Sequence, residues 1–253
     1  MRALSAWISL ALIATPALCS TARAELILPP PAWTGARHFS EPADSPRVCV
    51  DPGHPSFEGD KLYEAIINRK VAHLLADRLV ELGHVVYITA GDLTADELFG
   101  RGFDNHGRPE QSRLEPAPPA DRAELCNEWG ADYMISIHHN YSIDPSTNHS
   151  LVLYGARDRA GGWSPRFPAA AEWARITAGE LADSMAVDGA EAGKDQSEVG
   201  GSMTVLAESE MPAILTEASF WSNPGERARL DDDDYLAGEA AALCRAFGRF
   251  LEK

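Results

Sequence analysis

The sequence predicts an α/β fold: a single domain with a twisted, mostly parallel sheet of about six strands and helices on both faces. Two observations favour this fold. Short apolar runs rich in β-branched residues, which are typical of buried strands, alternate with segments whose apolar residues recur at helical spacing. The chain has 253 residues, 45% of them hydrophobic, which is enough for a substantial core. The sequence shows no internal repeat and no second folded domain.

The N-terminal residues are expected to lie outside this domain. A basic residue precedes the apolar stretch Ala6–Ala14, and Ala22-Arg23-Ala24 forms a small-x-small cleavage signal. We therefore expect residues 1–24 to be a secretory signal peptide that is removed. Residues 25–46 are rich in proline and lack apolar periodicity, so they are expected to form an arm. The folded domain is then residues 47–253.

The first half of the domain is expected to alternate between strand and helix. Apolar residues at helical spacing predict a helix that starts at Leu62 and stops near Gly83, because glycine is favoured just after a helix. This helix lies between two β-branched runs, Val48–Val50 and Val85–Thr89. Residues 91–119 hold glycines and prolines without a periodic pattern, so we expect a long loop there. Loops of this length in compact domains are usually functional.

The second half repeats the alternation. Asp121, with Glu124 three residues on, resembles a capping box and predicts a short helix that ends near Trp129-Gly130. The polar, glycine-rich residues 189–201 are expected to form a second loop. The other expected elements are strands at Tyr133–His138, Ser150–Tyr154, Met203–Leu206 and Ala213–Thr216, and helices at Ala169–Met185 and Leu236–Leu251.

The charge of the chain argues against two classes of partner. The formal net charge is −16, with 38 acidic residues against 22 basic ones. So acidic a surface repels phosphate backbones and anionic lipid, which argues against nucleic acid and against adhesion to a membrane. After the N-terminal stretch no segment reaches ~18 uninterrupted apolar residues, so stable membrane insertion is not expected.

Three cysteines remain after the expected signal peptide: Cys49, Cys126 and Cys244. They are too few and too widely spaced for a disulfide framework or a zinc knuckle. In an oxidising compartment one pair could be bridged, and the sequence does not choose the pair.

Three apolar runs end at side chains that can bind a metal or carry a proton. The run Tyr133–Ile137 stops at His138, His139 and Asn140, the run Val48–Val50 leads through Asp51-Pro52-Gly53 to His54, and the run Pro212–Thr216 leads to Glu217. In open α/β sheets, ligands bind just outside the carboxyl ends of the strands. We therefore expect these three strand ends to form one site.

The residue types at these strand ends suit a hydrolytic zinc site. Such a site needs three protein ligands, an open position for water, and a carboxylate that takes the proton from that water. His54, Glu64 and His138 could supply the ligands and Glu217 the base. Each also has a structural interpretation when taken alone, because Asp-Pro-Gly-His is an ordinary turn and a first-turn glutamate is favoured by the helix dipole. Only their combination indicates a site.

Several further stretches match one family. They are Val50–His54, Glu64 with Asn68, Arg122 with Asn127, Ala131-Asp132 leading to Ser136–His138, and Pro212–Glu217 followed by Phe220, Ser222–Pro224 and Glu226. With these stretches, residues 47–250 resemble the zinc-dependent N-acetylmuramoyl-L-alanine amidases of the type-3 family. That family cuts the amide between the lactyl group of muramic acid and the stem peptide of peptidoglycan. The resemblance implies that His54, Glu64 and His138 bind zinc and that Glu217 is catalytic.

The sequence departs from this family in loops around the expected substrate. Thr89 is followed by Ala90 where the family usually has arginine, and His139 replaces the alanine of its usual His-Ala-Asn. We expect His139 and Asn140 to support the metal ligands or to face the substrate. These changes bear on specificity more than on hydrolysis.

The predicted function is zinc-dependent cleavage of the N-acetylmuramoyl-L-alanine amide in peptidoglycan or its fragments, in the periplasm or outside the cell. Two alternatives stay open. One is a zinc peptidase or deacylase for another amide, although the sequence lacks His-Glu-x-x-His. The other is a non-catalytic regulator that binds the wall. The arm is too short for a wall-binding module, so the domain finds the polymer itself or a regulatory protein partner delivers it. Loops 91–119 and 189–201 are expected to gate the site.

Overall fold

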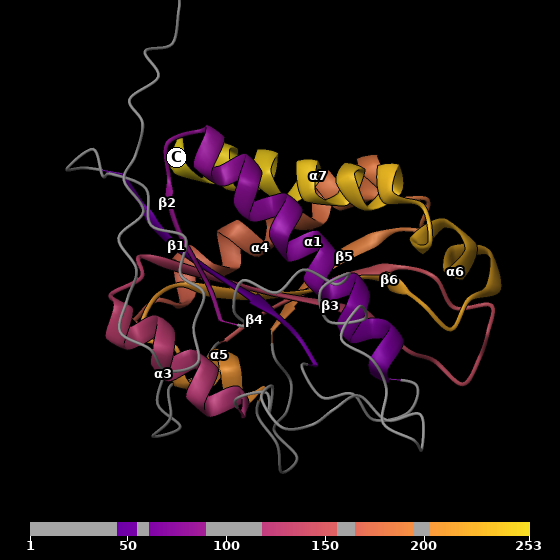
Figure 1. The fold of residues 1–253 in the computed structure, drawn as a ribbon, viewed down its shortest axis with the longest axis horizontal. Helices are drawn as coiled ribbons and strands as arrows, with labels where there is room; N and C mark the ends of the chain where they lie inside the picture. Colours follow the sequence, from indigo (N-terminus) through magenta and orange to yellow (C-terminus); the bar gives the residue numbers. More distant parts are fainter. Residues whose placement is uncertain (1–44, 55–60, 90–117, 156–164, 195–202) are drawn as a thin grey trace, which may run out of the picture.

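The computed structural model describes residues 45–54, 61–89, 118–155, 165–194 and 203–253. The expected signal peptide and almost all of the expected arm and of the loop 91–119 lie outside these residues. Within them, the chain forms one six-stranded sheet with helices on both faces (Figure 1). The predicted fold class is therefore confirmed.

The sheet is mostly parallel, with the strand order β2-β1-β3-β6-β4-β5. Two strands break the parallel order at one side, because β4 pairs antiparallel to β6, and β5 pairs parallel to β4. The carboxyl ends of β1, β3 and β6, which carry the expected site residues, therefore lie at the same end of the sheet. The strands are β1 (Arg47–Pro52), β2 (Val85–Ile88), β3 (Tyr133–Asn140), β4 (Ser150–Tyr154), β5 (Ala190–Lys194) and β6 (Ala213–Phe220).

The helices divide between the two faces of the sheet. α1 (Lys61–Glu81), α4 (Phe167–Ser184) and α7 (Asp233–Leu251) lie on one face, where α7 packs against both of the others (Figure 1). α3 (Pro119–Trp129) and the short α5 (Thr204–Glu208) pack together on the other face. A further helix, α6 (Pro224–Leu230), lies between β6 and α7 in the sequence. None of the described helices has the length and apolar character needed to cross a membrane.

Each face of the sheet buries its own apolar cluster, because successive side chains of a strand point to opposite faces. Val48 and Val50 of β1 pack in the cluster under α1, α4 and α7. Cys49, which lies between them in the sequence, packs in the cluster under α3 and α5. Ile135 and Ile137 of β3 belong to the first cluster. Odd-numbered residues of β3 thus face the layer of α1 and α7.

Two sequence-based assignments are wrong. The run Met203–Leu206, expected to be a strand, instead caps and begins helix α5, because a run this short, with three apolar residues, fits a helical turn as well as a strand. Residues 190–194, expected to belong to a loop, form the edge strand β5. Their sequence, Ala-Glu-Ala-Gly-Lys, has no β-branched or aromatic residue to indicate a strand. The rest of that expected loop, 195–201, lies outside the described residues.

The expected capping box is also wrong. α3 begins at Pro119 with Pro118 as its N-cap, and no side chain caps it. Proline suits the first helical position because its φ is already helical and it lacks the N–H that would go unbonded there. Gly130 ends the helix with a left-handed φ of 71°, as expected for a glycine at that place.

One disulfide joins β1 to α3. It links Cys49 to Cys126, two residues 77 positions apart in the sequence. Cys244 is buried in α7 and is not bridged. The structure thus supplies the pairing that the sequence left open.

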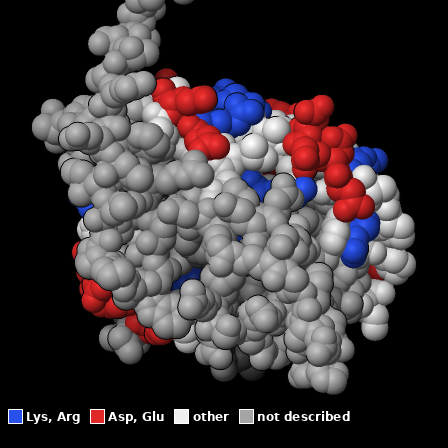
Figure 2. Space-filling model, viewed as in Figure 1, with Lys and Arg blue, Asp and Glu red and all other residues white. Residues whose placement is uncertain are grey.

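Some acidic side chains are neutralised locally by basic ones. In Figure 2, described acidic side chains (red) and basic side chains (blue) lie side by side on the face shown. Lys70 of α1 pairs with Asp233 of α7 at 2.8 Å. Glu180 of α4 pairs with both Arg245 and Arg249 of α7. These ion pairs connect the three helices that cover the larger apolar cluster.

Candidate metal centre

The chain reaches His54 through a turn that requires glycine. Gly53 N donates a hydrogen bond to Ile137 O of β3 at 2.8 Å, which continues the sheet pairing past the end of β1. A Cβ atom on Gly53 would lie 2.1 Å from His138 Cε1 and Nε2, closer than any side chain tolerates. His54 follows with φ 46°, in the left-handed region. The turn therefore brings the His54 and His138 rings together, with their centroids 4.8 Å apart.

A buried carboxylate anchors the strand that leads into this turn. Asp51 accepts hydrogen bonds from Arg122 Nε at 2.6 Å, from Ser136 Oγ at 2.7 Å and from Thr89 Oγ1. Burial alone would raise the pKa of Asp51, but the Arg122 guanidinium and these hydrogen bonds hold it below its usual value of 3.8. Asp51 is thus a buried anion that ties β1 to β3, to α3 and to the end of β2.

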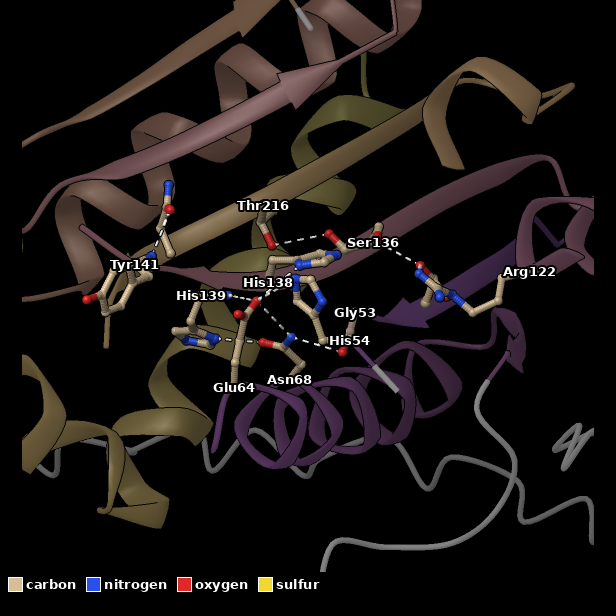
Figure 3. A network of polar contacts seen from close by, with 12 residues as sticks. Gly53, His54, Glu64, Asn68, Arg122, Ser136, His138, His139, Tyr141 and Thr216 are labelled. Carbon is tan, nitrogen blue, oxygen red and sulfur yellow. Dashed lines mark hydrogen bonds and ion pairs between the residues drawn. The ribbon is translucent and has the colours of Figure 1, made fainter. Parts of the chain in front are cut away.

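Glu64 of α1 and His138 of β3 complete a cluster with His54 (Figure 3). His138 Nδ1 lies 3.1 Å from Glu64 Oε1, and His54 Nε2 lies 3.6 Å from the same oxygen. The ligand atoms of the three residues all lie within 4.8 Å of one another. The structure therefore brings together the three residues that the sequence singled out as metal ligands.

The charges of these three residues are coupled. Burial would raise the pKa of Glu64, but its hydrogen bond to His138 and the nearby His54 lower it below the usual value. Burial would lower the pKa of His138, but the carboxylates of Glu64 and Glu217 raise it. The cluster thus favours a carboxylate beside positive charge, which is what a bound cation would supply.

Glu217 of β6 lies directly beside the cluster. It is paired in register with His138 of the neighbouring strand β3. Burial raises the pKa of Glu217 to about 7, with His138 opposing the rise and Glu64 adding to it. Its Oε2 atom is buried and has no hydrogen-bond partner among the described residues. Buried carboxylate oxygens are normally paired, so this atom is a candidate for chemistry.

His139 and Asn140 occupy different environments. His139 is 0% exposed, and its ring lies between Asn68 of α1 and Glu239 of α7. It faces the helices because it is an odd-numbered residue of β3. Asn140 is half-buried, and its Oδ1 accepts a hydrogen bond from Tyr141 N at 2.8 Å. The His139 side chain therefore lies behind the ligand cluster, whereas that of Asn140 bonds the backbone immediately after β3.

Two buried polar residues were missing from the sequence-based site. Asn68 contacts both Glu64 and the carbonyl of Gly53, and Glu239 contacts His139. Asn68 lies four residues after Glu64, hence on the same face of a helix. Glu239 interrupts the apolar stripe of the last helix, and a carboxylate at such a position is rarely buried without a partner. The sequence therefore contained enough information to identify both residues as buried polar candidates for the site.

The fold and the site together define a class: an α/β enzyme domain in which parallel strands end at a cluster of metal-capable side chains. Comparison with protein families identifies it. The chain belongs to the Amidase_3 family, described as N-acetylmuramoyl-L-alanine amidase, whose family model matches residues 48–248. The match covers nearly all of the domain, so the chain is an enzyme of this amidase class.

Solved structures of amidases share the fold. An N-acetylmuramoyl-L-alanine amidase from Clostridium difficile 630 is 21% identical with a TM-score of 0.63, over 83% of this chain and 99% of that one. AmiC2 of Nostoc punctiforme is 18% identical with a TM-score of 0.61, over 82% and 98%. The CwlD amidase from Clostridioides difficile, solved in complex with the GerS lipoprotein, is 18% identical with a TM-score of 0.62, over 82% and 99%. At identities of 18–21% the structural similarity establishes the fold alone. A comparison with curated proteins found no match.

Proposed function

We propose that this chain is a zinc-dependent amidase that hydrolyses the bond between N-acetylmuramic acid and L-alanine in peptidoglycan or its fragments. One observation carries the proposal: two imidazoles and a carboxylate gather their ligand atoms within 4.8 Å. Beside them lies Glu217, whose buried Oε2 has no partner among the described residues. Membership of the amidase family supplies the substrate class.

The set of donor atoms suits zinc. His54, Glu64 and His138 offer two ring nitrogens and one carboxylate oxygen, a combination typical of catalytic zinc sites that keep a fourth position open. The three residues come from a turn, a helix and a strand whose backbones are fixed by hydrogen bonds or close packing. Bound zinc would polarise the scissile carbonyl and lower the pKa of a water molecule to about 7.

Glu217 is proposed to transfer the proton. Its position next to His138 places its carboxylate beside the proposed ligands. With a pKa raised to about 7, this group can both accept a proton and release it near neutral pH. The proton would move from the attacking water to Glu217, and from Glu217 to the amine nitrogen of L-alanine as the C–N bond breaks.

We further propose that the enzyme acts outside the cytoplasm. The bridge between Cys49 and Cys126 supports this location, since disulfides persist mainly in oxidising compartments. The expected signal peptide of residues 1–24 also supports it. In this proposal residues 25–46 are an arm and residues 47–253 the zinc amidase domain. A regulatory protein partner is proposed by analogy with the CwlD amidase, which was solved with a lipoprotein.

Product analysis tests the proposed function. Protein from Glu25 onward is incubated with peptidoglycan and with a soluble muropeptide, with and without a chelator, and the products are examined by mass spectrometry. We expect stem peptides with a new L-alanine amino terminus, lost on chelation and restored by zinc. Cleavage of a different amide would favour the peptidase or deacylase alternative. Zinc binding without cleavage of either substrate would mean that the natural amide lies in another substrate or that the site is closed in the purified protein.

Glu217→Gln should remove nearly all turnover and leave zinc binding intact. Glutamine keeps the size of the side chain but cannot carry the proton, so kcat should fall by about 10²–10⁴-fold. Steady-state kinetics and zinc stoichiometry measure the two effects. Glu210→Gln, at an exposed position shortly before the same strand, serves as the matched control and should be fully active. Near-normal turnover in Glu217→Gln would remove Glu217 from the mechanism.

A further inference from the structure

A buried chain of hydrogen bonds connects α7 to the proposed metal ligands, and Figure 3 shows its part from His139 to Glu64. Glu239 Oε2 lies 3.0 Å from His139 Nε2, and His139 Nδ1 lies 2.9 Å from Asn68 Oδ1. Asn68 Nδ2 donates to Gly53 O at 3.1 Å and to Glu64 Oε1 at 3.4 Å. Glu239, His139 and Asn68 are each 0% exposed, so solvent water does not compete for these bonds.

The acceptors at the far end of this chain decide how the Asn68 amide is oriented. The carbonyl of Gly53 and the carboxylate of Glu64 can only accept, so the amide nitrogen must face them. The amide oxygen then faces His139, and the nitrogen Nδ1 of His139 must carry a hydrogen. The other ring nitrogen, Nε2, shares one proton with Glu239 Oε2, and either atom can hold it without changing the hydrogen on Nδ1.

The Asn68 amide contacts two parts of the proposed metal site at once. It holds the Glu64 carboxylate, and it holds the Gly53 carbonyl immediately before His54. If the amide turned over, its oxygen would face two other acceptors, and the resulting repulsion would displace Glu64 and the turn. The donor on His139 makes the turned orientation still more unfavourable, because the amide nitrogen would then face the Nδ1 hydrogen.

We propose that His139 is a positioning residue for the metal centre: it donates its Nδ1 hydrogen to Asn68 and so holds the amide against Glu64 and the turn that carries His54. This inference rests on the proposed function, because it concerns the groups that would hold zinc. The backbone N of His139 separately donates to Glu64 Oε1 at 3.3 Å, and a substitution of the side chain leaves that contact in place. Variants at this position therefore isolate the route through Asn68.

Two substitutions at His139 differ in the one atom that matters. His139→Asn can place an amide nitrogen where Nδ1 lies and still donate to Asn68, whereas His139→Leu offers no donor. Both variants leave Glu239 without its partner, so both should lose comparable stability. We expect zinc affinity, measured by competition with a chromogenic chelator, to fall about 10–100-fold in His139→Leu, the range typical for groups that orient metal ligands. In His139→Asn it should fall by well under 10-fold.

Two further variants separate positioning from general stability. Glu239→Gln can donate to Nε2 and leave the hydrogen on Nδ1, so zinc affinity should be retained. Tyr235→Phe removes two other hydrogen bonds of α7, from Tyr235 Oη to Glu226 Oε1 at 2.8 Å and from Ala186 N to Tyr235 Oη at 2.9 Å. It should lower stability in urea and leave zinc affinity unchanged.

Equal zinc affinities in His139→Leu and wild type, or equal losses in His139→Leu and His139→Asn, would overturn the positioning role and leave the proposed function intact. A wild-type protein that binds no zinc would overturn the proposed function, and this inference with it. A metal-free measurement needs no variant: the ¹⁵N spectrum of the wild-type imidazoles at neutral pH should show Nδ1 of His139 carrying a hydrogen. A bare Nδ1 would rule the inference out.

Discussion

The sequence predicted that Gly53 lies at the site, but it did not show why this position requires glycine. The sequence Asp-Pro-Gly-His indicated a turn into the site, and the turn is there. What requires glycine is the ring of His138, which belongs to a strand far along the chain. Likewise, alternation along β3 could have placed His139 on the same face as Ile135 and Ile137. Its partner Glu239 could not be assigned, because that contact depends on how α7 lies over the sheet.

Gly53→Ala should damage the metal centre directly. The added methyl would meet the His138 ring at 2.1 Å, so the ring or the turn must move. We expect a loss of about 1–3 kcal/mol in the free energy of unfolding, as for other overpacked sites, and weaker zinc binding. Denaturant titration and chelator competition measure the two quantities.

Gly248→Ala in α7 is the matched control for this change. A Cβ there meets nothing within 4 Å, and alanine favours a helix interior, so stability should stay equal or rise by about 0.5–1 kcal/mol. If Gly53→Ala behaved like Gly248→Ala, the close packing of the turn on His138 would be disproved.

Among helices and strands, long segments with a strong apolar pattern were predicted correctly, and short segments were not. The pattern of α1 and the apolar run of β3 predicted both elements near their observed ends. The run at 203–206 became a helix, and the edge strand β5 gave no signal, because tertiary pairing overrides weak local preference. The anchoring of β1 through Asp51 and Arg122 was equally hidden, since a buried ion pair joins elements that no local pattern connects.

Asp51→Asn should destabilise the fold in a pH-dependent way. The variant removes the negative charge that Asp51 places against the buried Arg122, and breaking a buried ion pair typically costs about 3–5 kcal/mol. The pKa of Asp51 is lower in the folded protein than its ordinary 3.8, so its contribution is fully present above the unfolded value and is lost as pH falls through the folded one. The gap between wild type and variant should therefore be constant from pH 7 to about pH 5 and should begin to shrink as the pH falls below about 4.

Denaturant titrations between pH 7 and pH 3 measure that gap. Asp183→Asn, at an exposed position of α4, is the control and should follow the wild type throughout. A gap that stayed constant down to pH 3 would show that the ionised form of Asp51 is not what stabilises the fold.

At the scale of the whole molecule, the sequence predicted the layers and the sheet but not all strand directions. Alternating strands and helices indicated a mostly parallel sheet, and four of the six strands are mutually parallel. The reversal at β4 was not predictable, because the residue pattern of a strand carries no direction. The same limit applied to the cysteines, whose pairing follows from the distance between β1 and α3.

Replacing both Cys49 and Cys126 with alanine should lower the free energy of unfolding by about 4 kcal/mol, as expected for a bridge that closes a loop of 77 residues. Urea denaturation of the two proteins, with and without reductant, measures the change. Reductant should lower the stability of the wild type and leave that of the double variant unchanged. Equal sensitivity to reductant in both would mean that the bridge does not stabilise the fold.

The disulfide also makes the stability of the folded chain depend on whether its compartment is reducing or oxidising. In an exported protein the two cysteines stay reduced in the cytoplasm and join only after translocation. A loosely held chain is easier to thread across a membrane, and a tightly held one resists proteases once it has arrived. In the exported enzyme that we propose, the pair Cys49–Cys126 would meet both needs, because it would be reduced in the cytoplasm and oxidised outside it.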